Sequence, residues 1–338
     1  MTSTDGAILE HLFAGQAVPA PLVEAFVEGL LANQIEPLRA AAVLAAWRCK
    51  GETADELAAA ATVLRRAMRI LPGASDSLDT CGTGGDGSGT FNISTATALV
   101  VAACGVPVVK HGNRAASGRS GSSDVLAELG VAIERGPDWA ARCFAEVGIA
   151  FCFAPHFHPH LAPLAPLRRT LGFRTIFNLL GPLANPAHSH YQLLGVGTAS
   201  ALDAVAGAIA RLGTRRAVVV HGQDGLDEVS LSAPTSVRIV EAGTVRALEW
   251  SAATFSLAGC SRAELLADGP AHSAAIIRRI LSGQDRDSAA ARVVLANAAA
   301  ALFAAQRVQH PLEAVTMARN AIESGQAAHR LDRLRAIE

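Results

Sequence analysis

The sequence predicts an α/β fold in which a small all-helical domain precedes a larger domain with a central mixed, mainly parallel sheet flanked by helices. Residues 22–31 repeat apolar side chains at helical spacing, and no strand pattern occurs before Pro72. After Pro72-Gly73, short apolar strands alternate with alanine-rich helices, an alternation typical of layered α/β domains. We expect the helical domain to cover residues 1–73 and the α/β domain residues 74–338.

Two helix starts are marked clearly in the N-terminal part. Pro37 stands where the first turn of a helix tolerates proline, ahead of an apolar run that continues to Trp47. Thr53-Ala-Asp-Glu56 forms a capping box, which predicts a helix that runs to about Arg69. The Pro-Gly pair that follows ends this helix.

The larger domain is predicted from its strand pattern. Residues 236–240 and 245–250 flank a Glu-Ala-Gly-Thr turn, which indicates an antiparallel hairpin near the sheet edge. Ser261-Arg-Ala-Glu264 resembles a helix cap, and the remainder is alanine-rich and mostly helical. The other expected strands are 106–109, 149–153, 191–196 and 217–220, with a helix over 200–212.

Composition excludes several classes of protein. With 29 basic and 30 acidic residues, the net charge of −1 provides no field that would attract nucleic acid or an anionic membrane. Six cysteines lack any C-x-x-C spacing, which favours buried reduced thiols. The uncharged stretch 87–109 begins with polar residues, unlike a membrane span, and the N-terminus lacks a signal-peptide pattern. We expect a cytoplasmic protein.

The segment 79–95 predicts an anion-binding loop. Five glycines lie within residues 82–89, after an expected strand and before a helix that begins near Asn92. Glycine allows a bulky anion to approach the backbone amides, and the helix N-terminus directs free N–H groups to the same place. The spacing fits neither a Walker loop nor G-x-G-x-x-G. Phosphate binding is therefore favoured over a flexible linker.

A second glycine- and serine-containing loop follows the next strand, over residues 110–124. Lys110, Arg114 and Arg119 place three cations there, and Lys110 is the only lysine after residue 50. Such side chains suit a multiply charged phosphate. We expect this loop to face the glycine-rich loop.

Asp227 and Glu228 follow the strand 217–220 in the segment Asp224-Gly-Leu-Asp-Glu228. Mg²⁺ binds one or two carboxylates together with substrate phosphates, so this pair is a candidate metal site beside the two anion loops. By itself the motif would fit a solvated surface turn equally well.

Three histidines alternate at positions 156, 158 and 160. On a strand they would share one face, as the ligands of a metal-dependent hydrolase could, but Pro155 and Pro159 disfavour a strand. We favour a single functional histidine, His158, and a carboxylate-binding arginine at Arg168 or Arg169. No nucleophile motif is identifiable, which suits catalysis by positioning and charge stabilisation.

Four motifs together resemble the anthranilate phosphoribosyltransferase family over nearly the whole chain. They are Gly82–Thr95, Lys110–Ser122, Arg174-Thr-Ile-Phe-Asn-Leu-Leu-Gly-Pro182 and Asp224–Glu228, in the family's order. The resemblance implies a phosphoribosyl-binding α/β domain, with about residues 160–185 packing back onto the helical domain. It also implies homodimers formed through the helical domain, small-molecule substrates only, and Mg²⁺, two ions per monomer.

The implied reaction is the second step of tryptophan biosynthesis: the amino group of anthranilate attacks ribose C1 of phosphoribosyl pyrophosphate (PRPP) as pyrophosphate leaves. His111 would lie near the meeting point of the substrates, and Ser94, Asp227 and Glu228 would bind magnesium. Anthranilate would contact Gly82, Asn113, His158, Arg168 and Gly181. PRPP would contact Gly82, Gly85, Asp86, Thr90, Asn92, Ile93, Ser94, Thr95, Lys110, His111, Gly112, Asn113, Arg114, Ala115, Ala116, Ser117, Gly118 and Ser122.

Two related alternatives and three departures complete the comparison. Pyrimidine nucleoside phosphorylases share the implied fold, but their loop reads Lys-His-Ser-Thr-Gly-Gly and they lack an adjacent Asp-Glu pair. A non-catalytic nucleic-acid-binding relative would have lost Asp227, Glu228 or Arg168 and gained a basic surface. His160 and Leu161 depart from the family where anthranilate would enter, and Ser273 replaces a common asparagine.

Overall fold

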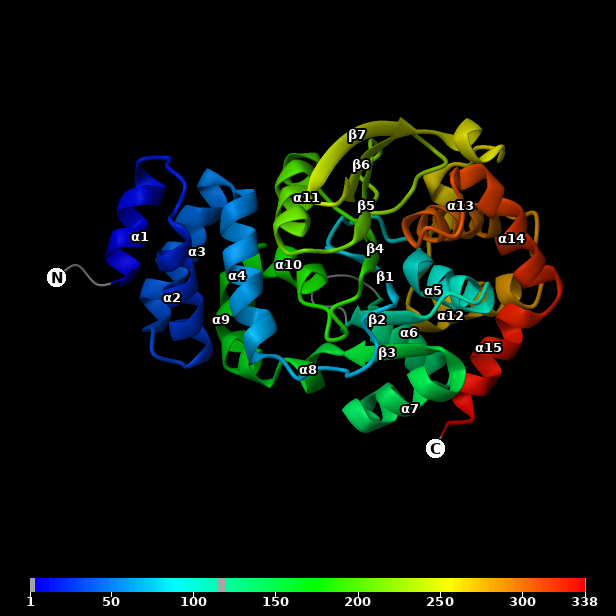
Figure 1. Ribbon diagram of the computed structural model, residues 1–338, viewed down its shortest axis with the longest axis horizontal. Coiled ribbons are helices and arrows are strands. Elements are labelled where there is room, and N and C mark those ends of the chain that lie inside the picture. The colour runs from blue at the N-terminus through cyan, green and yellow to red at the C-terminus, as the bar shows by residue number, and fades with distance from the viewer. Residues whose placement is uncertain (1–3, 115–119, 338) are drawn as a thin grey trace.

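The computed structural model describes residues 4–114 and 120–337. Its N-terminal part is a bundle of four helices, α1 (Thr4–Phe13), α2 (Ala20–Leu31), α3 (Pro37–Lys50) and α4 (Ala54–Ala67), drawn in blue in Figure 1. Pro37 is the first residue of α3, and the Thr53–Glu56 capping box is formed at the start of α4. The helical start of the chain is thus confirmed, with α4 ending two residues before the predicted Arg69.

A seven-stranded mixed sheet forms the centre of the larger part, in the order β3-β2-β1-β4-β5-β6-β7. The first five strands are parallel, and β6 and β7 form the expected antiparallel hairpin at one edge. The strands are β1 (Leu78–Gly82), β2 (Val108–Gly112), β3 (Ile149–Phe153), β4 (Tyr191–Gly195), β5 (Arg216–Gly222), β6 (Thr235–Glu241) and β7 (Thr244–Trp250). The prediction of a mixed, mainly parallel sheet is therefore confirmed.

Helices cover both faces of this sheet (Figure 1). On one face, strand residues such as Leu193, Val218 and Val220 form a hydrophobic core with the buried side chains of seven helices, including α5 and α13. These helices are α5 (Ile93–Ala103), α6 (Ser122–Glu128), α7 (Pro137–Val147), α12 (Pro270–Leu281), α13 (Ala289–Ala304), α14 (Pro311–Glu323) and α15 (Gln326–Arg335). None of the helices within the described ranges is long and apolar enough to cross a membrane.

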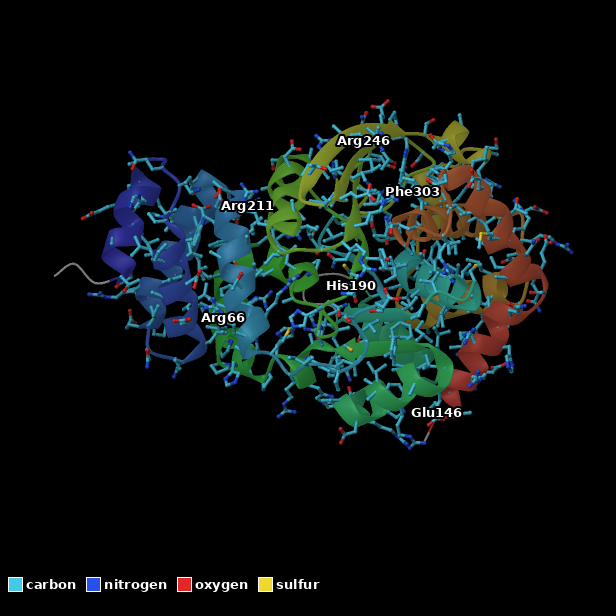
Figure 2. The ribbon with its side chains drawn as sticks, viewed as in Figure 1. Arg66, Glu146, His190, Arg211, Arg246 and Phe303 are labelled. Atoms are coloured by element: carbon cyan, nitrogen blue, oxygen red, sulfur yellow. The ribbon has the colours of Figure 1, made fainter. Side chains whose placement is uncertain are left out.

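The opposite face of the sheet shares its core with the helical bundle. Strand side chains alternate between the two faces of a sheet. Leu194 and Val219, which follow Leu193 and Val218 in sequence, therefore point to the opposite face, where they pack with α11 (Leu202–Arg211) and the helical bundle. Arg211 of α11 also donates to Asp55 of α4 at 2.6 Å, between the two parts in Figure 2. The segment between β3 and β4 contains the short helices α8 (Ala154–Phe157), α9 (Ala165–Leu171) and α10 (Ile176–Leu180), and part of it packs into the core shared with the bundle.

Two local expectations differ from the structure. Strand β2 begins at Val108, not at Val106, because Pro107 has no N–H to donate to the sheet. The expected helix after Ser261 is a single 3₁₀ turn, Arg262–Leu265. The chain leaves this turn at once because Leu266 pairs with Thr90 in an antiparallel bridge. A capping box marks the start of a turn but does not determine its length.

Glu56 is the buried polar centre of the helical bundle. Its carboxylate is fully buried and accepts hydrogen bonds from the Val18 N–H at 2.7 Å, Trp47 Nε1 at 3.0 Å, Lys50 Nζ at 3.0 Å and the Thr53 N–H at 2.8 Å. Burial by itself would raise the pKa of Glu56, but these donors together lower it below its ordinary value of 4.5. The charged carboxylate therefore holds the ends of three helices together.

We expect Glu56→Gln to lower the free energy of unfolding by ~2 kcal/mol, because the amide loses charge-assisted hydrogen bonds and presents N–H groups to donors. Urea denaturation measures this, with Glu28→Gln on the exposed face of α2 as the matched control. A lowered carboxyl pKa stabilises the fold above pH 4.5, and this contribution is lost as pH falls through the folded value. The loss of stability on acidification should therefore be smaller in Glu56→Gln, and an equal loss would contradict the assignment.

Candidate active site

A cleft of about 430 Å³ opens at the carboxyl ends of the parallel strands β1, β2 and β5. In open α/β sheets, ligands bind outside this edge, where the strand order reverses. The glycine-rich loop after β1 and the described part of the loop after β2 form most of its wall. Arg174, Asn178, Asp227, Glu228 and Ala267 complete it. Five segments far apart in the sequence thus meet in one cavity.

The glycines of the first loop are required by what packs against them. A Cβ on Gly82 would lie 2.5 Å from Asp227 Oδ2, and one on Gly85 would lie 2.8 Å from the Arg174 guanidinium. Gly85 also has a φ of +66°, which other residues rarely adopt. The Gly84 N–H donates to Asp227 Oδ2 at 2.9 Å. The loop is therefore fixed against the carboxylate and the guanidinium, as a binding loop is.

The end of this loop continues into helix α5. Asp86 Oδ1 accepts the Ser88 N–H at 3.0 Å, and Ser88 Oγ lies 3.0 Å from Thr90 Oγ1. Ile93, Ser94 and Thr95 form the first turn of α5, of which Ile93 and Thr95 are buried. The N–H groups of such a turn are oriented for an anion. The predicted anion-binding loop and helix start are thus formed together here.

Asn92, the residue before α5, connects the two loops. Its Oδ1 accepts from Ser120 Oγ at 2.8 Å and from Ser273 Oγ at 3.0 Å, while its N–H donates to Ser273 Oγ at 2.9 Å. Asn92 therefore uses its side chain to join loop 110–124 to the start of α12. Ser273, one of the departures from the family pattern, belongs to this connection.

Lys110 lies beneath the cleft with only 3% of its surface exposed. Its ammonium donates to the Thr80 carbonyl and, at 3.1 Å, to Ser94 Oγ. Its charge therefore lies between the middle of β1 and the first turn of α5, at the wall of the cleft.

The rest of the second loop is partly described. Gly112 ends β2 and lies against Ser122, and the Asn113 carbonyl accepts from Ser122 Oγ at 3.4 Å. Arg114 turns outward, where it pairs with Glu134 and, at 3.6 Å, with Asp124. The predicted contacts at Ala115, Ala116, Ser117 and Gly118 lie outside the described residues, as does Arg119.

Asp227 and Glu228 carry negative charge that the protein only partly compensates. Desolvation raises the pKa of Asp227, nearby Asp86 raises it further, and the Gly84 N–H opposes the rise. Desolvation and Asp227 likewise raise the pKa of Glu228, while Lys110 and the Ser94 N–H oppose this. Carboxylates held in this way favour a bound cation. Across the described ranges no three His, Cys, Asp or Glu side chains converge to hold a metal without other ligands.

His158, which is buried, and His111, which is half-buried, form a pair with ring centroids 4.9 Å apart. His111 Nδ1 lies 3.1 Å from the Gly181 carbonyl and His158 Nε2 lies 3.0 Å from the Ala184 carbonyl. Because carbonyls only accept, each of these nitrogens carries the proton. Burial and the neighbouring His158 lower the pKa of His111 to about 3, and burial lowers that of His158. His111 Nε2 is therefore a buried lone pair without a partner in the described structure.

The other two histidines do not join this pair. His156, in α8, lies edge-on against Phe153 at the end of β3. His160 is exposed in the 3₁₀ turn Pro159–Leu164. Residues 156–160 therefore do not form the strand that a shared metal-binding face would need.

The two candidate arginines on α9 differ in their surroundings. Arg169 is exposed, whereas Arg168 is partly buried, and burial lowers its pKa. No hydrogen bond or ion pair to the Arg168 guanidinium occurs in the described part of the chain. A partly desolvated guanidinium without a carboxylate partner is suited to bind an organic anion. The surroundings of the two residues thus favour Arg168 over Arg169 as the candidate for binding a carboxylate.

Arg174 is a site residue to which the sequence assigned no role, although it begins a motif of the family. Its guanidinium donates to the Thr83 carbonyl at 2.9 Å and lies directly under Gly85. Burial lowers its pKa, which Asp227 and Asp86 counteract. Arg174 reaches the glycine-rich loop only in the folded chain, so its position in the sequence did not indicate a role in this site.

Comparison with known proteins agrees with this architecture. Residues 7–68 match the helical bundle domain and residues 74–328 the a/b domain of the glycosyl transferase family. Anthranilate phosphoribosyltransferase from Thermomicrobium roseum is 47% identical and is covered over 96% of its length by 98% of this chain. The counterpart from Desulfitobacterium hafniense is 44% identical, with 95% of each chain covered.

Solved structures are similar over the same length. The crystal structure of anthranilate phosphoribosyltransferase from Thermus thermophilus has a TM-score of 0.90 and 39% identity, covering 98% of this chain and 99% of that one. The enzyme from Saccharomyces cerevisiae in complex with PRPP and Mg has a TM-score of 0.83 and 26% identity, covering 98% and 92%. With its two glycosyl transferase domains and these near full-length relatives, the chain belongs to the anthranilate phosphoribosyltransferase family.

Proposed function

We propose that this chain transfers the 5-phosphoribosyl group of PRPP to the amino group of anthranilate, giving N-(5-phosphoribosyl)anthranilate and pyrophosphate in the second step of tryptophan biosynthesis. The observation that carries the proposal is the meeting of a glycine-rich loop, the N-terminus of α5 and the Asp227–Glu228 pair in one cleft. This combination suits a substrate with several phosphates and a divalent cation. The family members named above are enzymes of this activity.

PRPP is proposed to bind along the two loops. The backbone from Gly82 to Thr90 and the first turn of α5 provide N–H groups, and the loop after β2 encloses the other side. Within the implied PRPP set, the side chains with hydroxyl or amide groups are those of Thr90, Asn92, Ser94, Thr95, Asn113 and Ser122. We propose that these side chains and the other residues of the implied PRPP set, between Gly82 and Ser122, contact PRPP. The geometry of the two loops supports this proposal.

Ser94, Asp227 and Glu228 are proposed to hold magnesium, two ions per monomer. Two desolvated carboxylates whose pKa values are raised, beside a serine hydroxyl, fit a hard cation that also takes phosphate oxygens. Bound Mg²⁺ would neutralise charge on the departing pyrophosphate. The protein holds the two carboxylates rigidly, since Asp227 accepts from Gly84 and Val229 is bonded to Asn297.

The acceptor is proposed to bind between the histidine pair, Gly181 and Arg168, with Asn113 and Gly82 toward PRPP. Arg168 would bind the anthranilate carboxylate, and the unpartnered His111 Nε2 would accept a hydrogen bond from the amine. The amine lone pair then forms the bond to ribose C1 while the C1–O bond breaks, its electrons leave with pyrophosphate, and the nitrogen releases one proton, which the departing pyrophosphate can accept. Because the pKa of His111 is about 3, its ring stays neutral and orients the amine near neutral pH.

A homodimer through the helical domain, which we place at residues 1–73, is also proposed. Phe13 and Leu38 are 77% and 76% exposed at the ends of α1 and α3. Large apolar side chains exposed on one domain support an interface. Light scattering of the purified protein measures its mass, and Phe13→Asp with Leu38→Asp should shift it from dimer to monomer. A monomer in the unaltered protein would contradict the proposal.

Arg174→Lys is expected to raise KM for PRPP by ~10-fold while changing KM for anthranilate little. Lysine keeps the charge but cannot both bond to the Thr83 carbonyl and form a flat support under Gly85. Steady-state kinetics at saturating co-substrate measure this, with exposed Arg169→Lys as the control. Equal changes in both KM values would show that Arg174 does not act through the glycine-rich loop.

The proposed activity is tested by mass spectrometry of a mixture of protein, PRPP, anthranilate and Mg²⁺. We expect N-(5-phosphoribosyl)anthranilate and pyrophosphate in equal amounts. Release of ribose 5-phosphate and pyrophosphate without the anthranilate adduct would instead indicate hydrolysis and reject anthranilate as the acceptor.

A further inference from the structure

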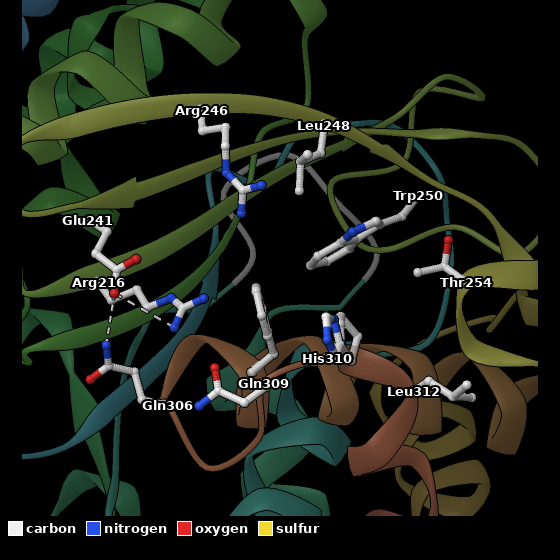
Figure 3. Close-up of a pocket in the computed structure, with 12 residues that line it drawn as sticks. Arg216, Glu241, Arg246, Leu248, Trp250, Thr254, Gln306, Gln309, His310 and Leu312 are labelled. Carbon is white, nitrogen blue, oxygen red and sulfur yellow. Dashed lines mark hydrogen bonds and ion pairs between the residues drawn. The ribbon is translucent and has the colours of Figure 1, made fainter.

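A second cavity, of about 760 Å³, lies between the β6–β7 hairpin and the start of α14 (Figure 3). None of the described residues that line it lines the catalytic cleft. Arg216 at the start of β5 forms part of its wall, whereas the cleft opens at the carboxyl end of that strand. Arg246 and Phe303 mark this region in Figure 2. The cavity is therefore separate from the proposed reaction.

Strand β7 directs one set of alternating side chains toward this cavity. Figure 3 shows Arg246, Leu248 and Trp250 extending from β7 toward Gln309 and His310 on the other side. Arg246 is exposed, and its guanidinium makes no hydrogen bond or ion pair with any other described residue. Glu241, the only carboxylate among the described lining residues, already accepts from Gln306 at 2.9 Å and pairs with Arg216 at 3.7 Å. The charge of Arg246 is thus left for a ligand.

Arg216 adds a second, more buried cation. Only 11% of its side chain is exposed, and its guanidinium lies 4.3 Å from the centre of the Phe303 ring. Its Nε is buried without a hydrogen-bond partner in the described structure. The guanidinium is therefore incompletely paired, and an anionic ligand at its exposed part would add a charge-assisted hydrogen bond. Two arginines against one carboxylate leave the lining with an excess of positive charge.

The start of α14 strengthens this field. Helix α14 begins at Pro311, and His310 before it makes no side-chain cap, so the positive end of the helix lies at the cavity wall. Glu313 in the first turn accepts the Gln309 N–H at 3.1 Å and offsets part of this charge, but it does not line the cavity. The net effect favours an anion.

Part of the remaining wall is apolar, beside the polar side chains of Thr254, Gln306, Gln309 and His310. Trp250 packs edge-on against Phe303, with ring centroids 5.9 Å apart, and Leu248 lies beside it on β7. Leu312, at the start of α14, is 47% exposed at the opposite side. An aromatic ring can lie against such a surface, while a carboxylate attached to it reaches the arginines.

We propose that this cavity binds a small aromatic carboxylate, with the carboxylate held by Arg246 and Arg216 and the ring packed against Trp250 and Leu312. The cavity volume is within the usual range for small-molecule sites. The arginine pair provides selectivity for the charge, and the apolar wall provides selectivity for the ring.

Calorimetric titration of the full-length protein with naphthalene-2-carboxylate tests this site, with naphthalene-2-carboxamide as the uncharged probe. We expect saturable binding of the carboxylate, and binding of the amide weaker by ~10-fold or more. Arg246→Gln should weaken carboxylate binding by a similar factor. Arg135→Gln, an exposed arginine near β3 at the other edge of the sheet, is the control and should leave binding unchanged.

Arg168→Ala separates this site from the acceptor site, where an aromatic carboxylate could also bind. The proposal requires that Arg168→Ala retain a binding event that Arg246→Gln loses. Binding that is abolished by Arg168→Ala but unaffected by Arg246→Gln would place the probe in the catalytic cleft and overturn the proposal. Absence of binding, or equal binding of carboxylate and amide, would also overturn it.

Discussion

Replacing Asp227 with Asn and Glu228 with Gln in one variant is expected to lower kcat/KM for phosphoribosyl transfer by ~10³-fold, because the carboxylates proposed to hold Mg²⁺ are removed. The dependence of the remaining rate on Mg²⁺ concentration should shift to higher concentration or disappear. The amide oxygen of the asparagine introduced at position 227 can still accept the Gly84 N–H, so the loop need not lose this hydrogen bond.

The same variant should be at least as stable as the unaltered protein when Mg²⁺ is absent. Desolvation raises the pKa of both carboxyls, Asp86 raises that of Asp227 further and Asp227 raises that of Glu228, which means that their charged forms destabilise the folded state. Neutral side chains remove that cost, so the melting temperature without metal should stay the same or rise while activity is lost.

Asp138→Asn with Glu249→Gln is the control for this experiment, because it removes the same charge from two exposed positions on α7 and β7. We expect it to change neither the magnesium titration nor the rate. An unchanged magnesium titration in the Asp227/Glu228 variant would contradict the proposed metal site, whatever the effect on the rate.

Replacing Arg168 with Ala is expected to raise KM for anthranilate by ~10- to 100-fold, the range that corresponds to a lost charge-assisted hydrogen bond. The dissociation constant for PRPP should change by no more than about twofold, because Arg168 lies on α9 and is not part of either loop. Initial rates over a range of anthranilate concentrations give KM, and calorimetry gives PRPP binding.

Arg169→Ala provides the matched control, since the two residues are adjacent and Arg169 is exposed. It should leave both constants unchanged. Arg168→Lys should recover only part of the loss, because an ammonium cannot form the two parallel hydrogen bonds of a guanidinium. Equal effects of Arg168→Ala and Arg169→Ala, or equal loss of both substrates, would contradict the role given to Arg168.

Much of the fold was predictable because its signals are local. Apolar runs that end in glycine or polar residues identified the parallel strands, and Glu241–Thr244 identified the hairpin, where Ala242 and Gly243 both have positive φ. The glycine-rich loop was predictable for the same reason, since its glycines and the helix that follows are contiguous in sequence.

The parts that were not predictable depend on contacts between distant segments. Arg174 reaches the glycine-rich loop only through the folding of residues 154–185 against the sheet, and Lys110 turns toward the Thr80 carbonyl because strands β1 and β2 are neighbours. Burial of Arg168 but not Arg169 depends on how α9 packs. The bond between Ser273 and Asn92 joins positions far apart in sequence.

Anthranilate fluorescence, followed over time with purified protein, PRPP and Mg²⁺, tests the central claim most directly. We predict a decay that requires all three components and stops when any one is omitted. A flat trace from folded protein that still binds PRPP would contradict anthranilate as the acceptor. The positions to examine would then be His160 and Leu161, which lie in the turn Pro159–Leu164 between His158 and α9.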